Sequence, residues 1–141
     1  PAAVLNGLET VYAVKQGFRV LARAAEVIEL STGGLGASLA NLQSKRDLYR
    51  RVIQATLECI RITAMQKDRV LPVLMKQLSL SQEDAAAIYD AVHSAWALDG
   101  RPTAGATKFE FDIDQRDMGL KEPPRPEQIY DFSLLEELGK R

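Results

Sequence analysis

Between Lys45 and about Gln66, apolar residues recur at alternating intervals of four and three positions. These intervals bring side chains together on one face of an α-helix, so the pattern predicts a helix of about six turns. The recurring residues are Leu48, Val52, Ala55, Cys59 and Ile62, and the flanking apolar residues are Tyr49, Ile53, Leu57 and Ile60. Because the combined face is wide, we expect half of the helix to be buried, with Cys59 as a small buried hydrophobic residue.

The first thirty residues are organised differently. Three short apolar runs predict strands, namely Ala2–Leu5, Phe18–Ala22 and Val27–Leu30. Residues Leu8–Gln16 predict a helix, because Asn6 and Glu9 have the spacing of a capping box and Gly17 supplies a left-handed end. An order of strand, helix and strand predicts an α/β fold for this part of the chain.

Helices are predicted again after residue 66. They are expected at Val70–Leu78, from the capping box of Ser81 and Asp84 to Asp99, and from Ser133 onward. The segment Lys108–Gln115 leaves two alternatives open. Its alternating apolar residues predict a strand, whereas Phe109 and Ile113 at a spacing of four, followed by Gly119, predict a helix. Its three acids have the chemistry of a hard-cation site, but a solvated face is the simpler interpretation.

Composition excludes several classes of function. With 18 basic and 19 acidic residues in 141, the formal charge of −1 gives no general attraction for nucleic acid. A single cysteine and a single histidine, His93, form neither a disulfide nor a Cys/His zinc cluster, and no catalytic arrangement is recognisable. No apolar run is long enough to cross a membrane. We therefore expect a non-enzymatic domain without cofactor or metal.

The stretch Leu30–Ser38 places three glycines within four positions. A phosphate-binding P-loop needs a Lys at the end of its glycine frame, and the next lysine here is Lys45. A dinucleotide fingerprint needs a third glycine where this chain has Leu39. The stretch instead predicts a turning point, where Gly33 and Gly34 free the backbone and the Thr32 hydroxyl can face a ligand.

Four runs of the sequence, taken in order, point to a family. They are "GFRVLARAAEVIELSTGGLGAS", "KRDLYRRVIQATLECIRI", "LSLSQEDAAAIYDAVHSAWALDGRP" and "PPRPEQIYDFSLLEE". Together they resemble the C-terminal part of solute-binding proteins of the nitrate/sulfonate/taurine ABC transporters, a group related to thiamine-pyrimidine precursor binding proteins. The resemblance covers nearly the whole chain.

The resemblance implies a partial periplasmic-binding-protein type II fold. Residues 1–34 would be a strand-helix-strand remnant of the second α/β lobe with the crossing strand. Residues 35–141 would be a helical segment that braces the hinge and the first lobe, which this chain would lack. The start at Pro1 would then lie within a longer protein or follow a removed signal.

The implied function is the extracytoplasmic capture of a small, anionic solute, such as a sulfonate or nitrate, for delivery to a membrane permease. The candidate ligand contacts are Asn6, Gly7, Leu8, Thr32, Gly33 and Gly34. The glycines would also serve as a hinge when the two lobes close. A homodimer of the chain is a further possibility.

Two alternatives remain. A helical protein-interaction module would bind a partner helix through the stripe between Lys45 and Gln66. A pyrimidine synthase of thiamine biosynthesis shares the implied fold, but one cysteine and one histidine argue against that enzyme.

Overall fold

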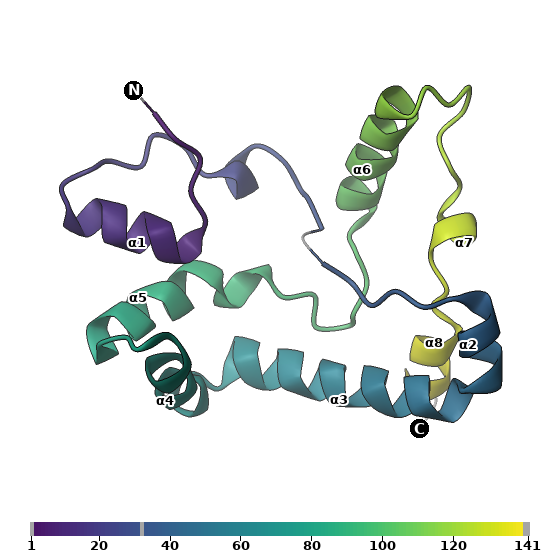
Figure 1. Ribbon diagram of the computed structural model, residues 1–141, viewed down its shortest axis with the longest axis horizontal. Coiled ribbons are helices and arrows are strands. Elements are labelled where there is room, and N and C mark those ends of the chain that lie inside the picture. The colour runs from purple at the N-terminus through teal and green to yellow at the C-terminus, as the bar shows by residue number, and fades with distance from the viewer. Residues whose placement is uncertain (1, 32, 140–141) are drawn as a thin grey trace. The chain divides into compact units, whose positions relative to one another are not determined.

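The computed structural model describes residues 2–31 and 33–139, and every regular element in these residues is a helix (Figure 1). The α-helices are α1 Gly7–Lys15, α2 Leu39–Ser44, α3 Arg46–Met65, α4 Lys67–Leu78, α5 Gln82–Val92, α6 Ala104–Asp117, α7 Pro126–Ile129 and α8 Ser133–Gly139, and the 3₁₀ turns are η1 Ala24–Glu26 and η2 His93–Ala95. The predicted α/β fold, and with it the partial periplasmic-binding-protein type II fold, is therefore wrong for the described residues.

The three predicted strands fail for lack of pairing partners. In the structure, Ala2–Leu5, Phe18–Ala22 and Val27–Leu30 have irregular backbone. A short apolar run becomes a strand only when a neighbouring strand accepts its backbone hydrogen bonds, and these three runs do not pair with each other. Their side chains remain in solvent: Phe18, Leu21 and Val27 are 66%, 78% and 77% exposed.

The local helix signals are confirmed. The Asn6 side chain accepts a hydrogen bond from the Glu9 backbone N–H (3.3 Å), and the Asn6 N–H donates to the Glu9 carboxylate (3.1 Å). Gly17 has a φ of +88°, and the Phe18 N–H donates back to the Ala13 carbonyl at 3.0 Å. At the start of α5, Ser81 Oγ accepts from the Asp84 N–H at 3.1 Å. Each of these motifs joins residues within five positions, so the sequence alone determines it.

The open segment Lys108–Gln115 is helical and lies within α6. Thr103 caps this helix by accepting from the Ala106 N–H at 3.0 Å, and Gly119 ends it with a φ of +65°. Phe111 is buried, whereas Phe109 and Ile113 are half-buried. On a helix, Phe111 lies about 200° around the axis from Phe109, so residues that alternate in sequence contact different neighbours.

The chain divides into two compact units. The first contains the residues up to Ala22 and Glu58–Leu98, and the second contains Arg23–Leu57 and the residues from Asp99 on. The point of division lies within α3, so this helix contributes residues to both units.

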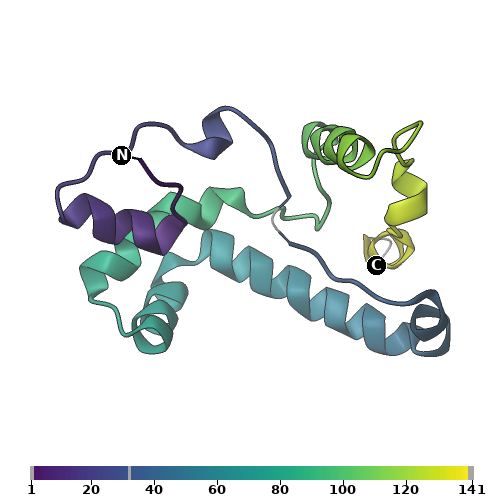
Figure 2. The ribbon, with the colours of Figure 1, turned by 45° about the horizontal axis from the view of Figure 1, so that its top comes forward.

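The first unit is built from α1, α4 and α5. Figures 1 and 2 show α1 and α4 against α5, the central element of the unit. Its core is Leu80, Ala85 and Ile88, packed against the half-buried residues Leu8, Val11, Leu71, Leu74 and Met75. Tyr89 is also buried, and its hydroxyl donates to the Ala64 carbonyl of α3 at 3.0 Å. An ion pair between Lys15 and Asp84 joins the end of α1 to the start of α5.

The second unit places the segment before α8 against α6. Its buried residues are Ala106, Phe111 and Leu134. Phe111, Tyr130 and Phe132 form a continuous stack, with ring centroids 5.7 Å and 5.5 Å apart. The Arg101 guanidinium lies over the Phe132 ring, with its Cζ 4.5 Å from the ring centroid, and adds a cation–π contact to the stack.

Candidate ligand site

The candidate contacts at the start of α1 are occupied by local structure. Asn6 uses its side-chain oxygen in the helix cap, and its carbonyl accepts from the Thr10 hydroxyl at 2.7 Å. A Cβ added to Gly7 would lie 3.3 Å from Val92 Cγ1, so α1 and α5 approach closely here. Leu8 packs on the core of the first unit. The helix cap and the core of the first unit explain the positions of all three residues. The side-chain amide nitrogen of Asn6 is the polar atom that these contacts leave for a ligand.

The other candidate contacts belong to the second unit. Thr32 lies outside the described residues. Gly33 and Gly34 are exposed, Gly34 has no left-handed φ, and a Cβ on either would meet nothing within 4 Å. The structure therefore does not require glycine at these two positions for space, nor at Gly34 for a special backbone conformation. Asn6–Leu8 and the glycines thus lie in different units.

Two carboxylates of the second unit hold the segment that leads to the glycines. The Ser31 N–H donates to Glu110 Oε1 of α6 at 2.5 Å, and the Thr103 hydroxyl donates to Glu29. Tyr130 donates from its hydroxyl to the other oxygen of Glu110 at 3.3 Å. Glu110 therefore joins three parts of the unit that are distant in sequence, and the segment is fixed just before Gly33.

Burial and the neighbouring charge of Glu110 raise the pKa of Tyr130, so this phenol remains a hydrogen-bond donor. Glu29, Glu110 and Tyr130 are not among the contacts predicted from the sequence. Their partners lie 20 to 79 positions away, and no local pattern indicates contacts across such separations.

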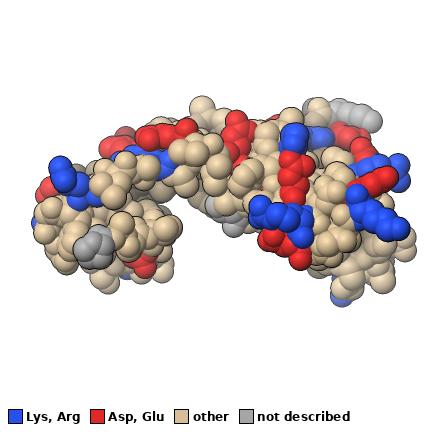
Figure 3. Space-filling view, turned by 90° about the horizontal axis from the view of Figure 1, so that it is seen from above, with Lys and Arg blue, Asp and Glu red and all other residues tan. Residues whose placement is uncertain are grey.

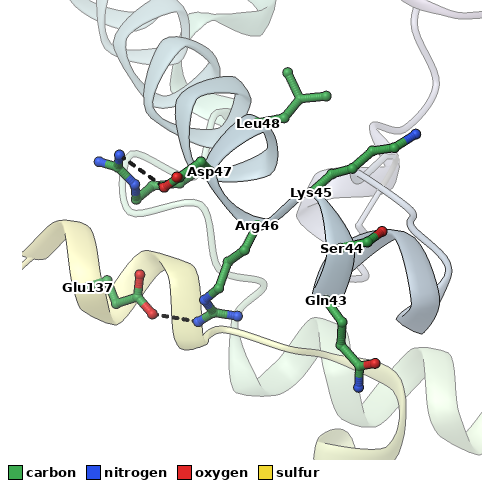
Figure 4. Close-up of a pocket in the computed structure, with 8 residues that line it drawn as sticks. Gln43, Ser44, Lys45, Arg46, Asp47, Leu48 and Glu137 are labelled. Atoms are coloured by element: carbon green, nitrogen blue, oxygen red, sulfur yellow. Dashed lines mark hydrogen bonds and ion pairs between the residues drawn. The ribbon is translucent and has the colours of Figure 1, made fainter.

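The second unit also has a hollow of about 410 Å³ at the start of α3 (Figure 4). It is lined by Gln43, Ser44, Lys45, Arg46, Asp47, Leu48, Arg50 and Glu137. Figure 4 shows Arg46 directed toward Glu137 of α8, with the guanidinium 2.5 Å from the carboxylate and 3.1 Å from Ser133 Oγ. Arg50 pairs with Asp47 at 3.4 Å. Each of the two arginines faces a carboxylate, whereas Lys45, the third cation of the lining, has no ion pair with a described residue.

Charges of both signs lie next to one another on the face of the protein drawn in Figure 3. Among residues 2–31 and 33–139, no group of three or more His, Cys, Asp and Glu side chains is placed to hold a metal ion. No helix in that part of the chain has the length and apolar character needed to span a membrane.

The predicted stripe on α3 is exposed rather than buried. We call Leu48, Val52, Ala55, Cys59 and Ile62 the α3 stripe. Leu48 is 47% exposed, Val52 is 40% exposed, Ala55 and Cys59 are exposed, and Ile62 is half-buried. The prediction that Cys59 is buried is therefore wrong. The flanking residues Ile53, Leu57 and Ile60 are half-buried, so the helix packs through a second apolar face on its other side.

The structure thus offers three features: the α1 cap, the anchored glycine segment and an apolar face of α3. The resemblance to ABC transporter solute-binding proteins is not tested by this geometry and stays a prediction. No model of a known protein family, no curated protein and no solved structure matches the chain.

Proposed function

We propose that this chain is part of the solute-binding component of an ABC importer, which captures a small anionic solute outside the cytoplasm and delivers it to a membrane permease. The order of four sequence runs supports the family. The observation that carries the proposal is the exposure of apolar side chains in irregular segments, above all Phe18, Leu21 and Val27. Burying each of these side chains would contribute about 1.5–3 kcal/mol, so further polypeptide that covers them would stabilise the protein strongly.

The glycine segment supports a role in ligand-induced movement. Ser31 is fixed to α6 through Glu110, whereas Gly33 and Gly34 have open space around them. A fixed point followed by glycines allows a large dihedral change over a few residues, as a hinge requires. The Gly34→Val variant should weaken ligand-induced closure, because a β-branched residue restricts the backbone, and it should leave the fold intact, because a Cβ at this position meets nothing within 4 Å.

A thermal-shift screen tests the proposal. The 141-residue chain and a longer protein that contains it are each heated with nitrate, small sulfonates, carboxylates and pyrimidines. We expect a stabilising shift with nitrate or a sulfonate in the longer protein alone. A shift in the short chain alone would place an independent site within it and contradict the proposal, as would the absence of any shift in the longer protein.

Small-angle scattering then tests the hinge, with Gly36→Val as the matched control. Gly36 is also free of neighbours within 4 Å, but it lies beyond the proposed turning point. Equal closure in the Gly34→Val and Gly36→Val variants would remove the hinge role of Gly34 and leave the binding function in place.

A second candidate function is a helical protein-interaction module, which the exposed α3 stripe favours. Four of its five residues are exposed, although they form one continuous apolar face. Such a face is typical of helices that bind a partner helix. This function predicts a defined complex in solution and no response to small solutes.

A further inference from the structure

Helix α3 has two apolar faces on opposite sides. Leu48 lies nine residues before Leu57, and Ala55 lies nine residues before Ala64. Since each residue advances about 100° around the axis, a separation of nine residues places two side chains about 180° apart. The stripe therefore points away from the face that includes Leu57 and Ala64.

The Leu57 face is the one that packs on the protein itself. In the second unit, a Cβ added to Gly100 would meet Leu57 Cδ2 at 2.9 Å. In the first unit, the Ala64 carbonyl accepts from Tyr89, which is buried. Because the Leu57 face packs within the protein, the α3 stripe on the opposite side of the helix remains available to a partner.

The spacing of the stripe is that of a coiled-coil seam. Its intervals of four, three, four and three match the a and d positions of consecutive heptads. Leu48, Ala55 and Ile62 take d positions, and Val52 and Cys59 take a positions. Because Ala55 and Cys59 are small, a second helix can approach the seam closely.

Charges beside the stripe define the orientation of that second helix. Arg51 and Glu58 are exposed, lie on the same edge of the stripe, and occupy successive g positions seven residues apart. Neither forms an ion pair with the residues that the structure describes. In antiparallel pairs of helices, g positions face g positions, so Arg51 of each copy would face Glu58 of the other. A parallel pair would place Arg51 of one copy beside Thr56 of the other. The charges of Arg51 and Glu58 would then both lack an opposite charge across the pair.

We propose that two copies of this chain associate through the α3 stripe as an antiparallel helix pair, with Arg51 of each copy facing Glu58 of the other. Leu48 then packs against Cys59 of the second copy, and Val52 packs against its Ala55. This inference rests on the second candidate function and names its partner. The seam from Leu48 to Ile62 is only about 21 Å long, so we expect weak, concentration-dependent dimers.

Sedimentation equilibrium of the 141-residue chain tests this pairing through a charge swap. The proposed dimer has two contacts between residues 51 and 58, one from each copy. The Arg51→Glu and Glu58→Arg variants each place like charges at both contacts, and we expect each to weaken dimerisation about tenfold. The double variant restores opposite charges and should recover the original affinity. Arg61→Glu makes the same charge change outside the seam and should have no effect. Circular dichroism verifies that all variants keep their helix content.

The orientation is tested with the Leu48→Cys variant and a short bismaleimide. Residues 48 and 59 of one helix lie about 16 Å apart, so a linker half that length joins them only between two copies. We expect a peptide that links residue 48 to residue 59, and no Cys59 to Cys59 link in the unmodified chain. A Cys59 to Cys59 link would overturn the antiparallel pairing. A monomer at every concentration, or a charge swap that fails to restore dimers, would overturn the self-association and leave the solute-binding proposal standing.

Discussion

Replacing Gly100 by alanine should destabilise the second unit for two separable reasons. Gly100 has a φ of +75°, a conformation that costs an L-amino acid about 1–2 kcal/mol. Alanine also restricts the unfolded chain, which offsets about 0.4–1 kcal/mol of this cost. The new Cβ would in addition lie 2.9 Å from Leu57 Cδ2, and displacing this half-buried leucine costs about 1 kcal/mol. The net loss of unfolding free energy should be about 2 kcal/mol.

A matched glycine separates the two contributions. Gly119 also has a positive φ, +65°, but a Cβ there would meet nothing within 4 Å. The Gly119→Ala variant should therefore lose only the backbone contribution, about 1 kcal/mol. Urea denaturation, followed by circular dichroism, measures both variants.

The role of Leu57 is tested by repeating Gly100→Ala in a Leu57→Ala background. Without the leucine methyl groups, the added Cβ has room, so the two glycine substitutions should then cost about the same. If Gly100→Ala and Gly119→Ala already cost the same with Leu57 in place, the close approach of Leu57 does not contribute. If the difference persists after Leu57 is removed, another contact is responsible.

Two further predictions concern the first unit. The neighbouring Lys15 ammonium and the Ser81 hydroxyl lower the pKa of Asp84, so the stability that Asp84 contributes is present above its ordinary pKa and is lost as the pH falls through the lowered value. The Asp84→Asn variant should therefore be less stable than the unmodified chain at pH 7, and urea denaturation from pH 7 to pH 2 should show that difference shrinking on acidification; a constant difference would contradict it. Ser79 ends α4 with a left-handed φ of +52°, so Ser79→Gly should raise the free energy of unfolding by about 0.5–1 kcal/mol, and a loss in urea denaturation would show that the serine side chain stabilises this turn.

Local sequence patterns predicted the helix caps well, although the helix that begins after Ser81 was expected to reach Asp99 and ends at Val92. The patterns failed where structure depends on distant partners. The caps at Asn6 and Ser81 involve neighbours three positions away, and both are confirmed. The apolar run Phe18–Ala22 looks the same in sequence whether or not a strand lies beside it, so its irregular backbone was not predictable. On α3, apolar residues occur on two sides, and periodicity does not indicate which side packs inward.

The candidate site shows the same division. The glycine segment was recognisable because three glycines in four positions are unusual. The hydrogen bonds of Glu29 and Glu110 that anchor this segment were not, because they join residues 74 and 79 positions apart. Such pairs form only after folding has brought the segments together.

The fully buried Ala85 limits how this chain can change over evolution. It lies in the core of the first unit, among residues of α1, α4 and α5, with no exposed surface. Any larger side chain would push at least one helix away from α5, and a compensating change would have to arise in a second helix at the same time. Natural relatives of this protein should therefore keep alanine, glycine or serine at position 85, while positions such as Leu21 vary freely unless another polypeptide covers them.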